Sequence, residues 1–125
     1  MASLEHVNIT VSDPAATARW LGTVFGWKTR WQGPAIHGGE TAHVGGDDFY
    51  VALYAPPNQG APAVQSYDIR GGLNHVGIVV DDLDAAQAGV KGAGFTPHSH
   101  ADYEPGRRFY FHDGDGIEWE VIAYG

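Results

Sequence analysis

Hydrophobic and polar residues alternate in two nearly identical octads, LEHVNITV at residues 4–11 and LNHVGIVV at residues 73–80. Alternation with a period of two predicts a β-strand that has Val and Ile on one face. His6 and His75 then lie on the opposite face of their strands. Because the two copies keep one register through the Asp and Ala residues that follow, the pattern indicates an internal duplication.

A helix is predicted after each octad. Asp13 stands where it can cap the first helix, and Asp81 or Asp82 can cap the second. Gly26 and Gly94 stand where the two helices are expected to end, because glycine readily adopts the left-handed conformation of a helix C-terminus. Each half of the chain therefore begins with a strand and a helix.

Three further strands are predicted after each helix, and the connections GGDD and DGDG are typical of tight turns. These strands are expected near 28–33, 40–45, 48–55, 96–100, 107–112 and 117–123. A Pro- and Gly-rich linker, 56–72, separates module one, 4–55, from module two, 73–123. The sequence predicts an α+β fold in which two tandem βαβββ modules form a single domain over residues 1–125.

Composition narrows the range of partners. The chain has 15 acidic and 7 basic residues, a net charge of −8, and no basic run longer than Arg107-Arg108. Because the chain is negatively charged, we do not expect it to bind nucleic acid or anionic membranes. The absence of cysteine excludes disulfides and thiolate metal sites. Because no apolar run approaches the roughly 18 residues of a membrane helix, we expect a cytoplasmic protein.

With these octads and the DGDGIEWEVIA segment, the chain resembles the vicinal oxygen chelate superfamily from Leu4 to Ile122. That superfamily includes glyoxalase I, extradiol dioxygenases, and the bleomycin and fosfomycin resistance proteins. The resemblance implies that eight strands form a half-open barrel with flanking helices and a divalent metal ion on the concave surface. It also implies that His6, His75 and Glu120 are the metal ligands.

The sequence departs from glyoxalase I in the fourth strand. Where that enzyme carries a second Glu, the segment FYVALYAP has Ala52. Glu40 is the candidate for a replacement ligand. Two imidazoles and one carboxylate leave about half of an octahedral shell open, as in non-haem Fe(II) oxygenases. We therefore expect Fe(II), with Mn, Zn or Ni as alternatives. A role for the histidines as hydrogen-bonded strand residues, with Glu120 a solvated carboxylate, remains the structural alternative.

A second group of candidates lies in the segment GRRFYFH. Tyr110, Arg108 and His112 share one side of the expected strand, and the other side is aromatic. The resemblance implies that Tyr110 hydrogen-bonds a metal-bound substrate oxygen. Arg107 or Arg108 is a candidate to steady an anionic substrate oxygen, or else a surface Arg. We expect His112 to belong to the following turn.

Four further histidines carry no assigned role: His37, His43, His98 and His100. His43 lies on the opposite face from Glu40 if its strand is regular, whereas His98 and His100 fall at a loop or strand edge. Extradiol dioxygenases use an additional His as an acid or base near the metal. None of these residues is matched to that role.

Three classes of function compete. An extradiol-type dioxygenase acting on a small molecule with vicinal oxygens is favoured. The second class is a glyoxalase-like lyase or isomerase, or fosfomycin-type thiol addition, and Ala52 argues against the isomerisation. The third class is a metal-free, bleomycin-resistance-like binding protein with an aromatic groove. Candidate groove residues are Trp20, Trp27, Trp31, Tyr50 and Tyr54. A homodimer is expected because a half-open barrel leaves strand edges and apolar surface to be covered.

Overall fold

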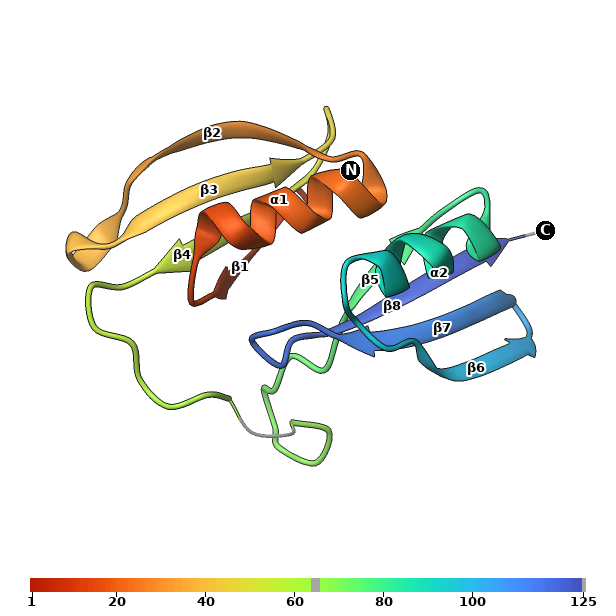
Figure 1. Cartoon of the computed structure of the whole chain (residues 1–125). Coiled ribbons are helices and arrows are strands. Elements are labelled where there is room, and N and C mark those ends of the chain that lie inside the picture. Colours follow the sequence, from red (N-terminus) through yellow and green to blue (C-terminus); the bar gives the residue numbers. More distant parts are fainter. Residues whose placement is uncertain (64–65, 125) are drawn as a thin grey trace. The chain divides into compact units, whose positions relative to one another are not determined.

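The chain folds into two compact units, Met1–Gly60 and Ala61–Gly125, in a computed structural model that describes residues 1–63 and 66–124 (Figure 1). The first unit contains β1 (His6–Thr10), α1 (Pro14–Phe25), β2 (Lys28–Pro34), the 3-10 turn η1 (Ile36–Gly38), β3 (Glu40–Gly45) and β4 (Tyr50–Ala55). The second contains β5 (Val76–Val79), α2 (Leu83–Gly92), β6 (His98–Tyr103), β7 (Gly106–His112) and β8 (Glu118–Tyr124). The predicted α+β fold of two βαβββ modules is confirmed.

Both modules share one sheet topology. The strand order is β1-β4-β3-β2 in the first sheet and β5-β8-β7-β6 in the second. In each, the first strand pairs in parallel with the last, and the other pairs are antiparallel. The duplication seen in the octads therefore extends to the whole module. The described strands form two four-stranded sheets without closing a barrel.

The helix boundaries follow the capping residues, with one correction. Asp13 accepts hydrogen bonds from two backbone N–H groups at 3.1 and 3.3 Å, and Gly26 ends α1 with φ 75°. Asp82, rather than Asp81, caps α2. The helix α2 ends at Gly92 with Ala93 as its C-cap, next to the glycine expected at its C-terminus. Gly94 follows in the left-handed conformation, with φ 95°.

One face of each sheet is buried under one helix. In the first unit α1 packs against β2, β3 and β4, and in the second α2 packs against β8. The side chains on these covered faces form the core: Leu21, Val44, Val51, Leu53, Phe109, Phe111, Trp119 and Val121. Because side chains alternate along a strand, the residues between them lie on the uncovered face of each sheet. The candidate functional residues are on these uncovered faces.

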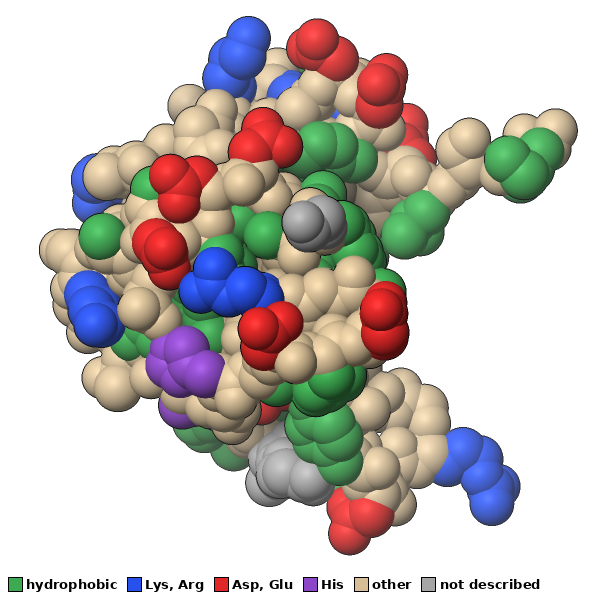
Figure 2. Space-filling model, turned by 90° about the vertical axis from the view of Figure 1, so that its right-hand side faces the viewer, with side chains coloured by type: hydrophobic (Ala, Val, Ile, Leu, Met, Phe, Trp, Pro, Cys, Tyr) green, Lys and Arg blue, Asp and Glu red, His purple; other side chains and the backbone are tan. Residues whose placement is uncertain are grey.

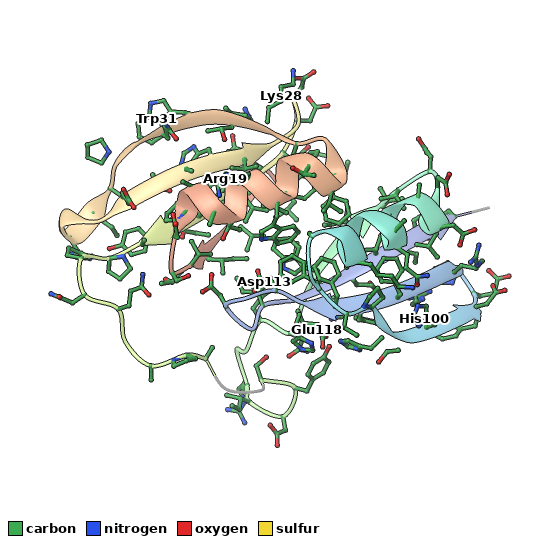
Figure 3. The ribbon with its side chains drawn as sticks, in the orientation of Figure 1. Arg19, Lys28, Trp31, His100, Asp113 and Glu118 are labelled. Carbon is green, nitrogen blue, oxygen red and sulfur yellow. The ribbon has the colours of Figure 1, made fainter. Side chains whose placement is uncertain are left out.

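A buried carboxylate anchors the turn between β7 and β8, where Asp113 is labelled in Figure 3. Its side chain accepts hydrogen bonds from the Trp119 indole at 3.1 Å and from the backbone N–H groups of Asp115 and Ile117 at 2.9 and 3.0 Å. Burial raises the pKa of the Asp113 carboxyl, although these three donors act in the opposite direction. The DGDG motif thus ties the turn to the core.

Charged side chains are mixed on the face of the molecule drawn in Figure 2. Lys and Arg side chains lie singly on that face, among more numerous Asp and Glu side chains. This distribution agrees with the net charge of −8. Within the described residues, none of the helices has the length and apolar character needed to cross a bilayer.

We expect Asp113→Ala to lower the free energy of unfolding by about 2–3 kcal/mol, because three donors in a buried turn lose their acceptor. Urea denaturation followed by tryptophan fluorescence measures the change. Asp48→Ala is the matched control, since Asp48 is an exposed residue of the corresponding β3–β4 turn. It should change stability by less than about 0.5 kcal/mol. Equal effects of the two substitutions would contradict the anchoring role.

Candidate functional site

Seven polar residues gather on the uncovered face of the second sheet. They are His75, His98, Arg108, Tyr110, His112, Glu118 and Glu120. Strand register brings them together, since Tyr110 pairs with both Glu120 and His98, and His112 pairs with Glu118. Figure 3 shows Glu118 on the side of this sheet away from α2.

Glu120 is the centre of the first contact network. Its Oε2 accepts hydrogen bonds from the Tyr110 hydroxyl at 2.7 Å and from Arg108 at 3.1 Å. Its Oε1 lies 3.7 Å from Nε2 of His75. The hydrogen bond to Glu120 raises the pKa of Tyr110, so this hydroxyl keeps its proton at neutral pH and acts as a donor. Three of the five predicted site residues, Arg108, Tyr110 and His75, therefore surround Glu120.

Arg108 is a partly buried residue with several contacts, which argues against the surface-Arg alternative. Besides Glu120, it donates to the backbone carbonyl of Gly106 at 3.3 Å. Its guanidinium carbon lies 4.6 Å from the centre of the Tyr103 ring. Arg108 Nε has no hydrogen-bond partner within the described part of the chain. The guanidinium thus orients Glu120, while its Nε is buried.

The other nitrogen of His75 faces a second carboxylate. His75 Nδ1 lies 3.1 Å from the Tyr67 hydroxyl and 3.5 Å from Glu118 Oε1. Tyr67 also donates to Glu118, and this hydrogen bond raises the pKa of Tyr67 to about 12. A carboxylate behind one imidazole nitrogen is a common support for a histidine that binds metal through the other nitrogen. His75 therefore has the setting of a metal ligand.

The first module lacks the carboxylate at the matching position. Ala52 pairs with Asn8 in the first sheet, as Glu120 pairs with Gly77 in the second. Asn8 and Gly77 occupy the same place in the repeated octads. The register therefore gives Ala52 the place in module one that Glu120 has in module two.

His43 lies beside Ala52. The two residues are cross-strand partners, just as Tyr110 partners Glu120 in the other sheet. Glu40 lies on the opposite face of β3 from His43, because an odd number of positions separates the two along the strand. Glu40 therefore does not replace the missing carboxylate. The imidazole of His43 is the polar group next to Ala52 on that face.

Aromatic rings stack on the uncovered face of the first sheet. The Tyr50 ring lies between His6 and His43, with ring centres 4.7 and 4.4 Å away. Trp31 contacts His43 at 5.1 Å, and the Arg30 guanidinium carbon lies 5.0 Å from the Tyr50 ring centre. This stacked face, defined by His6, Tyr50, His43 and Trp31, includes two of the expected groove residues.

The other expected groove residues lie elsewhere in the first unit. Trp20 and Trp27 each contact Phe25, at 6.3 and 5.8 Å between ring centres. The Tyr54 hydroxyl donates to the backbone carbonyl of Ile36 at 3.0 Å. Tyr54 alternates with Leu53 and Ala55, so it shares the uncovered face of β4 with Tyr50. A groove that includes all five residues stays a prediction.

His6 is part of this stack and is partly exposed. Its Nδ1 lies 2.8 Å from Glu5 Oε1, which leaves Nε2 as the nitrogen without a described partner. His6 belongs to the first unit, whereas His75 and Glu120 belong to the second. The convergence of all three on one ion stays a prediction.

Sequence reasoning missed a second polar network on the second sheet. His112 is the last residue of β7, so its expected place in the turn is wrong, while His98 begins β6 at the expected strand edge. His98 Nε2 lies 3.0 Å from His112 Nδ1, and His112 Nε2 lies 3.3 Å from Glu118 Oε2. Spacing in the sequence could have indicated this network. Glu118 lies two residues from Glu120, and His112 lies two residues from Tyr110, so each pair shares one face of its strand.

The sequence of the chain matches a known family. The model of the Glyoxalase/Bleomycin resistance protein/Dioxygenase superfamily matches residues 3–121. The chain belongs to this superfamily. No curated protein matches it in sequence.

Solved structures of other superfamily proteins share the fold. A glyoxylase/bleomycin resistance protein/dioxygenase domain from Frankia sp. EAN1pec is 22% identical, with a TM-score of 0.84 over 100% of this chain and 93% of that one. TnmS3, an antibiotic binding protein from Streptomyces sp. CB03234, is 20% identical, with a TM-score of 0.75 over 100% and 98% of the two chains.

A third structure contains a metal ion. It is a mutant of the fosfomycin resistance protein FosX from Listeria monocytogenes, complexed with Mn(II) and 1S,2S-dihydroxypropylphosphonic acid. It is 18% identical, with a TM-score of 0.77 over 100% of this chain and 92% of that one. Proteins with this fold thus include both a metal-containing resistance protein and an antibiotic binding protein.

The second module of this superfamily member has donors that fit a divalent ion. Atoms bound to one ion at about 2.0–2.2 Å lie about 3–3.5 Å from each other. His75 Nε2 and Glu120 Oε1, at 3.7 Å, are close to that separation. One neutral imidazole and one carboxylate are also a suitable donor pair for Fe, Mn, Zn or Ni.

We expect His43 to titrate below the ordinary imidazole value of about 6.5. Burial lowers its pKa, and the nearby His6 and Arg30 lower it further. The unfolded chain then binds this proton more readily, so the contribution of His43 to stability is present above pH 6.5 and lost as pH falls through the lowered pKa. A pH titration of the imidazole resonances by NMR measures the midpoint.

Arg30→Gln is the matched variant for this titration, because it removes one of the charges that lower the His43 pKa. It should move the midpoint of His43 toward 6.5. A wild-type midpoint at or above 6.5 would contradict the assigned environment.

Proposed function

We propose that this protein is a divalent-metal-dependent enzyme that acts on a small molecule with vicinal oxygens, by extradiol-type ring cleavage. His6, His75 and Glu120 would hold the ion, and Fe(II) is preferred over Mn(II), Zn(II) and Ni(II). The main support is the pair formed by His75 Nε2 and Glu120 Oε1, 3.7 Å apart, with the Tyr110 hydroxyl on the same carboxylate.

The protein's own groups prepare this site. A bound ion would act as a Lewis acid toward the substrate oxygens and lower their pKa. Arg108 and Tyr110 both engage Oε2 of Glu120, so Oε1 is the oxygen that remains for a ligand. Tyr67 and Glu118 engage Nδ1 of His75, which directs Nε2 to the same place. Both ligands are thus oriented before an ion binds.

Tyr110 and Arg108 are the residues we assign to the substrate. The Tyr110 hydroxyl keeps its proton and lies next to the ligand carboxylate, where it can donate to a substrate oxygen. Arg108 carries a fixed positive charge beside Glu120, which suits an anionic oxygen. In this proposal Tyr110 orients the substrate, and Arg108 stabilises its negative charge.

A small-molecule binding protein is the second candidate. The stacked face of His6, Tyr50, His43 and Trp31 supports it, since Trp31 is half exposed and flat ligands stack on such rings. Similarity in fold to the antibiotic binding protein TnmS3 is consistent with this alternative. On this hypothesis the aromatic rings, and not Glu120, determine ligand affinity.

We also propose that the two modules act as one domain in a cytoplasmic homodimer. Each described sheet has two edge strands, β1 and β2 in the first and β5 and β6 in the second. Free strand edges favour pairing or coverage by another surface, and a second copy of the chain is the commonest partner.

We expect Glu120→Gln to lose iron, because an uncharged amide replaces the only charged ligand. The loss in affinity should be at least about 10- to 100-fold. Protein purified anaerobically is analysed by mass spectrometry for metals and then tested for oxygen uptake over a panel of catechols. Glu104→Gln, which changes an exposed Glu, should keep both metal and activity. If Glu120→Gln also keeps both, the proposed metal centre is wrong.

We expect Tyr110→Phe to keep its metal while kcat falls by about 10- to 1000-fold, as for the loss of one transition-state hydrogen bond. Tyr124→Phe is the control, since Tyr124 is an exposed tyrosine of β8. Steady-state oxygen uptake and metal content are measured for both. A wild-type protein without turnover, whose ligand affinity falls in Trp31→Ala but not in Glu120→Gln, would instead support the binding protein.

A further inference from the structure

The second polar network has the composition of a metal site. His98, His112 and Glu118 come from β6, β7 and β8 and lie on one face of one sheet. One donor atom from each residue lies within 4.8 Å of the other two. Two histidines and a glutamate are a common ligand set for catalytic zinc, in which the fourth position stays open. This triad shares no residue with His6, His75 and Glu120.

The three side chains of the triad lie close to one another. His98 Nε2 lies 3.0 Å from His112 Nδ1, and His112 Nε2 lies 3.3 Å from Glu118 Oε2. Nitrogen and oxygen donors around a tetrahedral ion with bonds of about 2.0–2.1 Å lie about 3.4 Å apart. Only one His112 nitrogen would bind the ion, so one of these two distances involves the nitrogen that does not. With one donor atom from each residue, the triad lies within 4.8 Å, and the side chains must move closer to reach the tetrahedral spacing.

The backbone around His98 is unusual in a way that directs its side chain. Ser99 has φ 55°, and the pairing of β6 with β7 is irregular between His98 and Ala101. Such bulges commonly redirect a side chain, and backbone strain of this kind is concentrated at functional sites. Ser99 Oγ also lies 2.9 Å from Nδ1 of His98, which leaves Nε2 for the triad. The bulge thus aims one imidazole nitrogen at His112.

Glu118 is held by residues outside the triad, and His112 is open to solvent. Glu118 Oε1 accepts a hydrogen bond from Tyr67 and lies 3.5 Å from His75 Nδ1, so Oε2 is the oxygen directed toward His112. Ligands held by such outer partners bind metal more tightly. The His112 side chain is 50% exposed, whereas that of Glu118 is 15% exposed. An ion can enter from solvent and keep an open position toward it.

We infer that His98, His112 and Glu118 form a second divalent-cation site, beside the proposed site of His6, His75 and Glu120. An ion there would join β6, β7 and β8, and its carboxylate ligand would also orient His75. Because the proposal depends on residues of the second module alone, it stands whether or not His6 completes the other site.

The test uses the full-length, tag-free protein after removal of metal. Zn²⁺ is titrated into the wild type and the double variant His98→Gln/His112→Gln, with bound Zn²⁺ counted by equilibrium dialysis and metal analysis. His100→Gln is the matched control, because His100 lies in the same strand but contacts Gln87 and Phe109. We expect the double variant to bind one Zn²⁺ fewer per chain than the wild type and the control.

NMR spectroscopy of the histidine side chains identifies the ligands directly. Imidazole resonances of His98 and His112 should shift on addition of one equivalent of Zn²⁺, whereas those of His100 should not. The single variant His112→Gln changes an exposed side chain and should bind Zn²⁺ at least about 10- to 100-fold more weakly. It also provides the readout if the double variant does not fold.

The outcomes separate the two sites. Glu120→Gln should leave Zn²⁺ binding at His98 and His112 intact, because Glu120 is not part of this triad. If Glu120→Gln loses one ion and the His98/His112 variant loses none, the second site is wrong and the proposed site of His6, His75 and Glu120 stands. Unchanged His98 and His112 resonances at saturating Zn²⁺ would also overturn the inference. Loss of an ion only in the His98/His112 variant would support the second site and contradict the proposed metal enzyme.

Discussion

Side chains alternate between the two faces of a β-sheet, and in each module a single helix covers only one of these faces. The covered face takes the large apolar residues, such as Phe109 and Trp119, which are fully buried. The residues between them, such as Tyr110 and Glu120, must then lie together on the uncovered face. Burial of one face thus concentrates the polar chemistry of each module on the other.

The two modules use the same topology for different chemistry. Ala52 and Glu120 occupy equivalent places in their sheets, and their cross-strand partners are His43 and Tyr110. Without a carboxylate, the first module gathers stacked rings and a histidine whose pKa is lowered by burial. With two carboxylates, the second module gathers hydrogen-bond donors and imidazoles. Duplication therefore produced one uncovered face with stacked rings and one with carboxylates and imidazoles.

The carboxylates of the second module are each held by more than one partner. Glu120 engages Arg108 and Tyr110 through one oxygen, and Glu118 engages Tyr67 and His112 through different oxygens. A partly buried carboxylate with several donors has few orientations available to it. In the proposed metal sites, such preorganisation would lower the cost of binding an ion.

Local sequence was sufficient for the elements and their faces, because caps, turns and alternation act between residues a few positions apart. Asp13, Gly26 and the octads predicted α1 and the first strands, and spacing placed Tyr110 and Arg108 on one face. The tertiary structure decided which of these residues meet. Pairing of β6, β7 and β8, and the bulge at Ser99, join positions up to 20 residues apart, so the contacts of His98, His112 and Glu118 depend on a register that no local pattern records.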